Sequence, residues 1–307
     1  LRVRGSFPYG YGSIFGIGSN NVYGLDKRCG IYISGKNVTI DKAEVQQRAF
    51  GHAIFMGPGA ENVLIKNSLV EGILRPSADL YEETESHDLP FRANYKLPCD
   101  VAGNCNNGGA PIPKDQMFTL TEDGIRIYRG AGKVTVENTT VKKTRGGIRL
   151  YFGIEDTTVT NCTAIDCGST NYNMPSGGTI TGSAGNFAYA PLSDFRTAKS
   201  NQNLELTLLP SPHAMGPHNI ADVQGNNHQI VFHRAPGPLD GEERAIVVTG
   251  NHSTIRNETE YPIILASGSR GNTIISAGPV TDNGNNDVSE IELSLTSPKA
   301  KAKRIIP

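Results

Sequence analysis

Two arginine–tyrosine pairs occur at the same place in two copies of one short sequence pattern. The pairs are Arg126 with Tyr128 and Arg149 with Tyr151. The copies span residues 124–138 and 147–161, and the second begins 23 residues after the first. Aliphatic residues flank each arginine, so in an extended strand the arginine and tyrosine point to the face opposite the aliphatic side chains. The repeat predicts two guanidinium groups close together on an outward face, where they can bind a carboxylate.

Two stacked arginines repel each other unless an anion compensates them. Two interpretations are open. Nearby acidic side chains can neutralise the guanidinium groups, and the candidates are Glu122, Asp123, Glu155 and Asp156. Alternatively, the arginines belong to an anion-binding groove. Earlier coils place aromatic residues in the same column, which reads Tyr32, Phe55, Arg126 and Arg149.

Further basic and aromatic residues concentrate around this column and around one interruption of the repeat. His52 precedes Ala53, which matches Gly124, so we expect His52 on a turn like Asp123. We predict catalytic roles for Arg126, Arg149, Tyr128, Lys114, Lys96 and His52. We predict substrate-binding roles for Arg75, Arg145, Tyr32, Phe55, Tyr95 and Tyr151. This combination suits a sugar acid, because aromatic rings stack on pyranose faces and arginine binds carboxylates bidentately.

The elements that position these residues are short strands separated by Gly or Asn, and no helical period persists. Short strands at a period of about 23 residues predict an all-β fold, a right-handed single-stranded parallel β-helix. The predicted inward ladders contain Ile125, Ile127, Val134, Val136, Ile148, Leu150 and Val159. The period weakens over residues 168–221 and coils resume near His228, Ser253 and Asn272.

We expect a single parallel β-helix domain over residues 1–307. Residues 75–120 are polar, aperiodic and rich in Pro and Gly, which predicts a flap-like inserted loop over the groove. Residues 283–307 form a charged, poorly repetitive C-terminal tail in this interpretation. No signal peptide is visible, but the first residues read as the interior of a fold, so we expect a leader to have been removed from a secreted or periplasmic protein.

Composition excludes several classes of function. The chain carries 29 Lys and Arg against 30 Asp and Glu, so a general nucleic-acid binder is not expected. The chain contains no apolar run of about 18 residues or more, so we do not expect a membrane span. We predict no metal site and no cofactor. His213 and His218 lack the pattern of a zinc site, and a Ca²⁺ ion near Asp79 and residues 82–85 is weakly supported. We expect a monomer or homodimer.

The five cysteines include two close pairs, Cys99 with Cys105 and Cys162 with Cys167. Local pairs in loop-rich sequence favour small disulfides and an oxidising compartment. We therefore predict a Cys99–Cys105 bond, whereas for Cys162 and Cys167 a disulfide and reduced thiols are equally open. Reduced, buried thiols are the alternative, most of all for Cys162, whose place in a coil points inward.

Three stretches together resemble secreted β-helix polysaccharide lyases, most of all the alginate and glucuronan lyases of polysaccharide lyase family thirty-one. They are Gly51–Arg75, Asp79–Thr84 and Thr121–Arg126. The likeness covers about residues 29–168. The resemblance implies metal-independent β-elimination that uses Tyr together with Lys or Arg.

We therefore predict a carbon–oxygen lyase that acts on an acidic polysaccharide. Arg126 and Arg149 would neutralise the uronate carboxylate, and Tyr128, Lys96, Lys114 or His52 would move protons. One alternative is a β-helix glycoside hydrolase that uses Glu122, Asp123 and Asp156. The other is a non-catalytic carbohydrate-binding β-helix protein.

Overall fold

The computed structural model describes most of the repeat and leaves several segments aside. The described residues are 1–5, 29–47, 51–72, 74–76, 117–119, 121–144, 146–150, 154, 156–167, 170–174, 177–185, 195–197, 200–209, 220–234 and 245–291. Within them the regular elements are all β-strands and none is a helix. Two large sheets carry nearly all of these strands, and the strands of both sheets pair in parallel. This arrangement is compatible with a parallel β-helix.

The fifteen-stranded sheet joins two strand positions of the early coils into one position of the later coils. Its strands are β1 (Arg2–Gly5), β3 (Thr39–Asp41), β4 (Glu44–Gln47), β6 (Val63–Lys66), β7 (Leu69–Glu71), β11 (Val134–Glu137), β12 (Thr140–Lys142), β14 (Thr157–Thr160), β15 (Thr163–Ile165), β17 (Thr179–Gly185), β19 (Asn203–Leu208), β21 (Gln229–Arg234), β23 (Thr254–Asn257), β25 (Arg270–Ser276) and β27 (Asn285–Glu290). The two positions merge at β17, which pairs with both β14 and β15.

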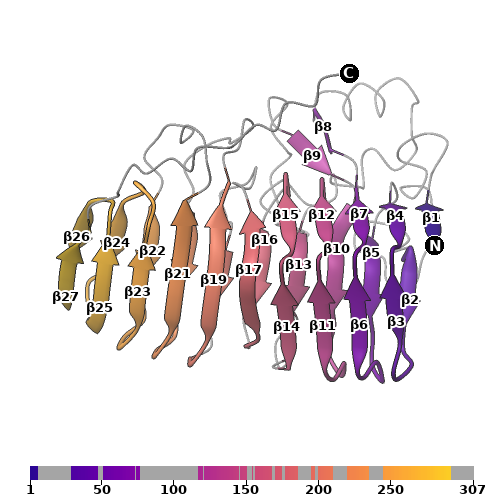
Figure 1. Ribbon diagram of the computed structural model, residues 1–307, viewed down its shortest axis with the longest axis horizontal. Helices are drawn as coiled ribbons and strands as arrows, with labels where there is room; N and C mark the ends of the chain where they lie inside the picture. The colour runs from indigo at the N-terminus through magenta and orange to yellow at the C-terminus, as the bar shows by residue number, and fades with distance from the viewer. Residues whose placement is uncertain are drawn as a thin grey trace, which may run out of the picture.

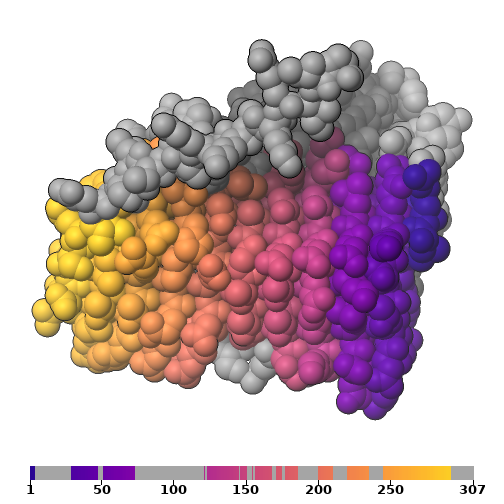
Figure 2. Space-filling view, viewed as in Figure 1, coloured from indigo at the N-terminus to yellow at the C-terminus, as the bar shows by residue number. Residues whose placement is uncertain are grey.

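The ten-stranded sheet forms a second layer in the same coil order. Its strands are β2 (Ile31–Ile33), β5 (Gly51–Met56), β10 (Thr121–Ile127), β13 (Gly146–Leu150), β16 (Thr170–Met174), β18 (Phe195–Thr197), β20 (Ala221–Val223), β22 (Ile246–Val248), β24 (Ile263–Leu265) and β26 (Val280–Asp282). Figure 1 shows one layer behind the other, with the strands of both following one another along the long axis. In the space-filling view the chain colours follow one another in bands, so each coil lies against its neighbours in sequence (Figure 2).

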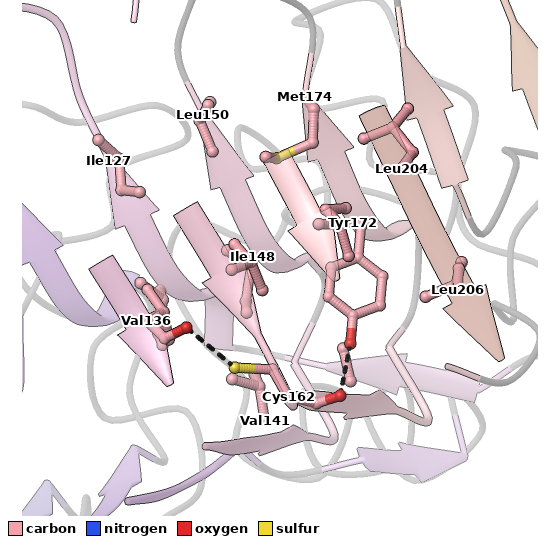
Figure 3. Packing of buried hydrophobic residues seen from close by; sticks show 14 of the residues in the cluster. Ile127, Val136, Val141, Ile148, Leu150, Cys162, Tyr172, Met174, Leu204 and Leu206 are labelled. Carbon is pink, nitrogen blue, oxygen red and sulfur yellow. Dashed lines mark hydrogen bonds between the residues drawn. The ribbon is translucent and has the colours of Figure 1, made fainter. Parts of the chain in front are cut away.

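The core lies between the two sheets and consists of stacked aliphatic side chains (Figure 3). All seven residues predicted to point inward are buried, with exposures of 2% or less. Inward and outward side chains alternate along each strand, and parallel pairing keeps equivalent residues in line. The inward residues therefore stack into continuous ladders. Strands also continue through residues 168–221, where the sequence repeat is weak, as β16 to β20.

Asparagines in the left-handed conformation form the bend between two strands of one coil. Asn67, Asn138 and Asn161 have φ values of 52°, 46° and 51°. Asn is among the few residues other than Gly that adopt this conformation readily. The Asn67 side chain donates to Asp41 Oδ1 at 2.8 Å, and Asn138 donates to Asn67 Oδ1 at 3.4 Å. Turn geometry therefore explains why both sequence copies end in Asn.

The predicted insertion begins and ends on a small antiparallel pair of strands. β8 (Leu74–Pro76) pairs with β9 (Met117–Thr119), and Figure 1 shows them outside the two layers. Residues 77–116 lie outside the described residues. In the segment predicted as a tail, residues 285–290 form β27, which pairs in parallel with β25. The part of the chain that the structure describes contains no helix with the length and apolar character of a membrane span.

Of the two alternatives for Cys162 and Cys167, the structure has the reduced, buried thiols, and the disulfide is not formed. Cys162 is a buried free thiol whose Sγ donates to the carbonyl oxygen of Val136 at 3.4 Å (Figure 3). The strand β15 lies between the two cysteines, and a rise of about 3.3 Å per residue over its three residues separates them by more than a disulfide spans. Burial raises the pKa of the Cys162 thiol to about 11. Cys99 and Cys105 lie outside the described residues.

Candidate functional site

The outward column predicted from the repeat is present on the ten-stranded sheet. Parallel pairing places Tyr32 beside Phe55, Phe55 beside Arg126, and Arg126 beside Arg149. The flanking aliphatic residues are buried, so these four side chains occupy the outer face. The register confirms the alignment of Ala53 with Gly124, because Ile54 pairs with Ile125. The next strand continues the column with Asn173.

A second column lies three residues upstream in each strand. His52 pairs with Asp123, and Asp123 pairs with Gly146. The expectation of a turn at His52 and Asp123 is wrong, since both residues lie within strands, β5 and β10. The register between these two strands shifts just before Asp123. Such an irregularity changes the direction of a side chain at the sheet surface.

Asp123 is the centre of the site. Its side chain is 1% exposed, and three side chains approach its carboxylate. Arg149 Nη1 donates to Oδ1 at 3.2 Å, Arg126 Nη1 lies 3.6 Å from Oδ2, and His52 Nδ1 lies 3.2 Å from Oδ2. Asp123, one of the four acidic candidates, therefore neutralises part of the positive charge of Arg126 and Arg149. Two guanidinium groups thus face this one buried carboxylate.

Gly146 makes this arrangement possible because it has no side chain. A Cβ atom there would overlap Arg149 Cδ and Asp123 Oδ1. Asp123 occupies this position on β10, and His52 occupies it on β5. The space left by Gly146 is filled by Arg149 as its side chain turns back toward the carboxylate.

Aromatic rings pack beside the charged groups, with Phe55 in the middle. Its ring centroid lies 5.5 Å from Tyr32, 5.0 Å from His52 and 5.3 Å from Tyr128. The guanidinium carbon of Arg126 lies 5.7 Å from the Tyr128 ring centroid, within cation–π range. Tyr32 is 56% exposed, so one end of this stack faces solvent. A Cβ atom at Gly57 would overlap the Tyr32 ring, so Gly57 leaves room for it.

The chemistry of this surface is a positively charged patch beside an aromatic platform. Arg126 and Arg149 side chains are 14% and 22% exposed, so each is held below the surface yet remains reachable. Buried charges of this kind interact more strongly with a ligand than charges in free solution. The arrangement suits a ligand that has both a carboxylate and a ring face.

The structure brings together six of the predicted site residues. They are His52, Tyr32, Phe55, Arg126, Tyr128 and Arg149. Arg75 lies in β8, and its side chain is not described. The others lie outside the described residues: Lys96, Lys114, Arg145, Tyr95 and Tyr151. The sequence did not indicate that three of the six converge on Asp123. The one available signal was that His52, Asp123 and Gly146 precede equivalent strand residues.

A second charged cluster, absent from the sequence predictions, lies on the fifteen-stranded sheet. His233 on β21 contacts Glu205 Oε1 through Nε2 at 2.8 Å and Glu258 Oε2 through Nδ1 at 2.7 Å. Burial opposes protonation of His233, but the two carboxylates outweigh it, so the pKa of His233 is raised. A hydrogen bond from Arg256, together with His233, lowers the pKa of Glu258. The cluster thus links β19, β21 and the residue after β23 by ion pairs.

No protein-family model matches the chain, and no curated protein matches it. Among the described residues, no group of three or more His, Cys, Asp or Glu side chains is arranged to hold a metal ion. The Asp79 and 82–85 segment lies outside those residues.

Proposed function

We propose that this protein is a polysaccharide lyase that cleaves a 1,4-linked uronan, such as alginate or glucuronan, by β-elimination. The observation that carries the proposal is the pair of guanidinium groups, Arg126 and Arg149, held on one buried carboxylate beside an aromatic stack. The resemblance to the family-thirty-one lyases points the same way. Secretion of the protein belongs to the same proposal.

We also propose the finer architecture, a right-handed single-stranded parallel β-helix. Successive coils of the chain pair in parallel in both sheets, as β5, β10 and β13 do. Parallel strands joined by crossovers are right-handed in nearly all proteins. In this arrangement the ten-stranded sheet presents the site residues on one side of the coil stack.

The proposed reaction begins with binding of the uronate carboxylate by Arg126 and Arg149. Their positive charge makes the proton on C5 more acidic and stabilises the enolate that forms when this proton leaves. The electron pair of the C5–H bond then forms the C4–C5 double bond, and the bond from C4 to the glycosidic oxygen breaks. A general acid protonates that oxygen. We assign this role to Tyr128, whose ring packs against Arg126.

The hydrolase alternative fits this face less well. Hydrolysis requires two carboxyl groups that reach the glycosidic bond. The Asp123 side chain is 1% exposed and faces two arginines and His52, so it cannot reach a sugar directly. Asp156 is exposed but directly precedes β14 in the other sheet, and Glu122 has no described side chain.

The test is incubation of the purified chain with alginate, polyglucuronate and pectate. A lyase produces unsaturated ends, which absorb in the ultraviolet because the new double bond is conjugated with the carboxylate. Carboxyl-reduced samples of the same polymers are the matched control and should give no signal, since they lack the group that the arginines bind. Reducing ends without ultraviolet absorbance would indicate a hydrolase. Polymer binding without any product would indicate a non-catalytic protein, and either result rejects the proposal.

A further inference from the structure

His52 occupies an unusual place on the outer face of β5. Its ring stacks on Phe55 at 5.0 Å with an interplanar angle of 12°. Its side chain is 10% exposed, and Nδ1 is a buried atom. The exposed part of the side chain therefore lies at other atoms. One face of the ring lies on the Phe55 ring, and Nδ1 makes a charge contact with Asp123 Oδ2 at 3.2 Å.

The closeness of Nδ1 to the Asp123 carboxylate favours one tautomer of His52, because a lone pair on Nδ1 would be repelled by a negative charge. Two guanidinium groups face Asp123, and nearby positive charge favours the ionised carboxylate. An ionised carboxylate can only accept hydrogen bonds. The favourable state therefore has a hydrogen on His52 Nδ1. A neutral imidazole has one donor and one acceptor, so Nε2 then remains unprotonated and can accept a proton.

We propose that His52 Nε2 takes the C5 proton of the uronate and that Asp123 is the positioning residue that holds His52 as its Nδ1–H tautomer. This inference rests on the proposed function and names the base of that reaction. The proton moves from C5 to Nε2 and the electron pair stays with the substrate. His52 becomes an imidazolium ion, and the negative charge of Asp123 stabilises it.

The neighbouring residues divide the remaining work. Arg149 contacts Oδ1 of Asp123, whereas His52 and Arg126 share Oδ2. One carboxylate thus orients the groups that bind the substrate carboxylate and the group that takes the proton. His52 and Tyr128 both pack on the Phe55 ring, so the proposed base and the proposed acid lie on the same aromatic residue.

The first measurement is the tautomer of His52 in the intact protein. Long-range proton–nitrogen NMR correlations of ¹⁵N-histidine-labelled protein distinguish an Nδ1–H from an Nε2–H imidazole, and the spectrum of a His52→Gln variant identifies the signals of His52. We expect the Nδ1–H form. Asp123→Asn should convert it to the Nε2–H form, because an amide group can donate to Nδ1. An Nε2–H form in the unmodified protein would overturn the inference without any activity assay.

The second measurement is turnover of the uronan that the unmodified chain cleaves. We expect a loss of about 100-fold or more for both His52→Gln and Asp123→Asn, and no further loss in the double variant, because the two residues act as a unit. Glu258→Gln, which alters the other histidine–carboxylate pair, is the matched control and should leave both turnover and the His52 tautomer unchanged.

The outcomes distinguish a failure of the proposed lyase function from a failure of the proposed role of His52. If no uronan is cleaved, the proposed function fails, and the proton-transfer role fails with it even when the tautomer is Nδ1–H. If a uronan is cleaved and His52→Gln retains full turnover, the lyase proposal stands and the inference about His52 is wrong. His52→Gln also tests the inference if Asp123→Asn does not fold, because it leaves Asp123 and its two arginines unchanged.

Discussion

Two clusters in this molecule join a histidine to carboxylates across neighbouring strands, and their charges differ. On the ten-stranded sheet, one buried carboxylate, Asp123, faces two arginines and His52. On the fifteen-stranded sheet, Glu205 and Glu258 face His233, and Arg256 also binds Glu258. In the first cluster two arginines share one carboxylate. The second is balanced when His233 is protonated.

In the proposed function the first cluster binds the substrate, whereas the second links strands. Arginines held just below a surface attract a ligand of opposite sign, whereas a balanced set of ion pairs mainly connects the strands that carry it. The second cluster borders a shallow groove of about 440 Å³, lined by Glu205, Val231 and Arg256, yet its charged groups already bind each other. We therefore expect substitutions in the first cluster to affect turnover and those in the second to affect stability.

The largest effect is expected from Arg126→Ala. Removal of this guanidinium group takes away charge stabilisation in the transition state, which typically lowers turnover by about 100- to 1,000-fold. Circular dichroism should stay unchanged, because the Arg126 side chain lies outside the core. Arg256→Ala removes the arginine of the other cluster and should retain full turnover. Equal losses in the two variants would remove the distinction between the clusters.

Gly146→Ala should have the next largest effect. The added methyl group overlaps Arg149 Cδ and Asp123 Oδ1, so Arg149 must leave the carboxylate. We expect about tenfold lower turnover and a loss of about 1–3 kcal/mol in unfolding free energy, as for other overpacked sites. Gly35→Ala is the control, because a Cβ atom there contacts only Val38 at 3.7 Å. Unchanged kinetics of Gly146→Ala would show that contact between Arg149 and Asp123 is not needed.

Tyr32→Ala should have a smaller effect, limited to substrate binding. Tyr32 is exposed and stacks on Phe55, so it extends the platform away from the charged groups. Loss of one aromatic contact of about 0.5–1.5 kcal/mol corresponds to an increase in KM of roughly two- to tenfold. Steady-state kinetics should show an unchanged kcat. A fall in kcat with constant KM would place Tyr32 in the chemical step instead.

The smallest effect is expected from His233→Gln, and it should depend on pH. Because the folded pKa of His233 is raised above 6.5, its contribution to stability is complete below that value and is lost as pH rises through the folded pKa. The lowered pKa of Glu258 sets the acid limit, since stability is lost as pH falls through it. Between these limits the variant should be less stable by about 1 kcal/mol or less.

Thermal unfolding from about pH 5 to about pH 9 measures this effect. The difference between His233→Gln and the unmodified protein should be largest near pH 6 and should shrink toward pH 9. Glu260→Gln breaks the adjacent ion pair with Arg234, which contains no histidine, and should not show this loss on the alkaline side. A constant difference for His233→Gln at every pH would contradict a role for its protonation.

Much of the architecture could be predicted from the sequence because a repeat restricts it strongly. The period, the inward aliphatic positions and the column of Tyr32, Phe55, Arg126 and Arg149 follow from alternation and parallel stacking. The sequence could not decide whether Cys162 and Cys167 form a disulfide, because nearness in sequence says little about distance when an extended strand lies between two residues. The strands over residues 168–221 were hard to predict, since pairing with neighbouring coils does not require a strict sequence repeat.

The sequence by itself determined that two arginines and two aromatic residues share one outward column, since strand alternation and the repeat leave little freedom. Only the tertiary structure decided that Arg149, Arg126 and His52 converge on Asp123. His52 and Asp123 come from strands separated by the long insertion, and side-chain direction depends on the local register shift and on the space at Gly146. Periodicity fixes the column of a side chain, whereas its contacts depend on the residues of the adjacent coils.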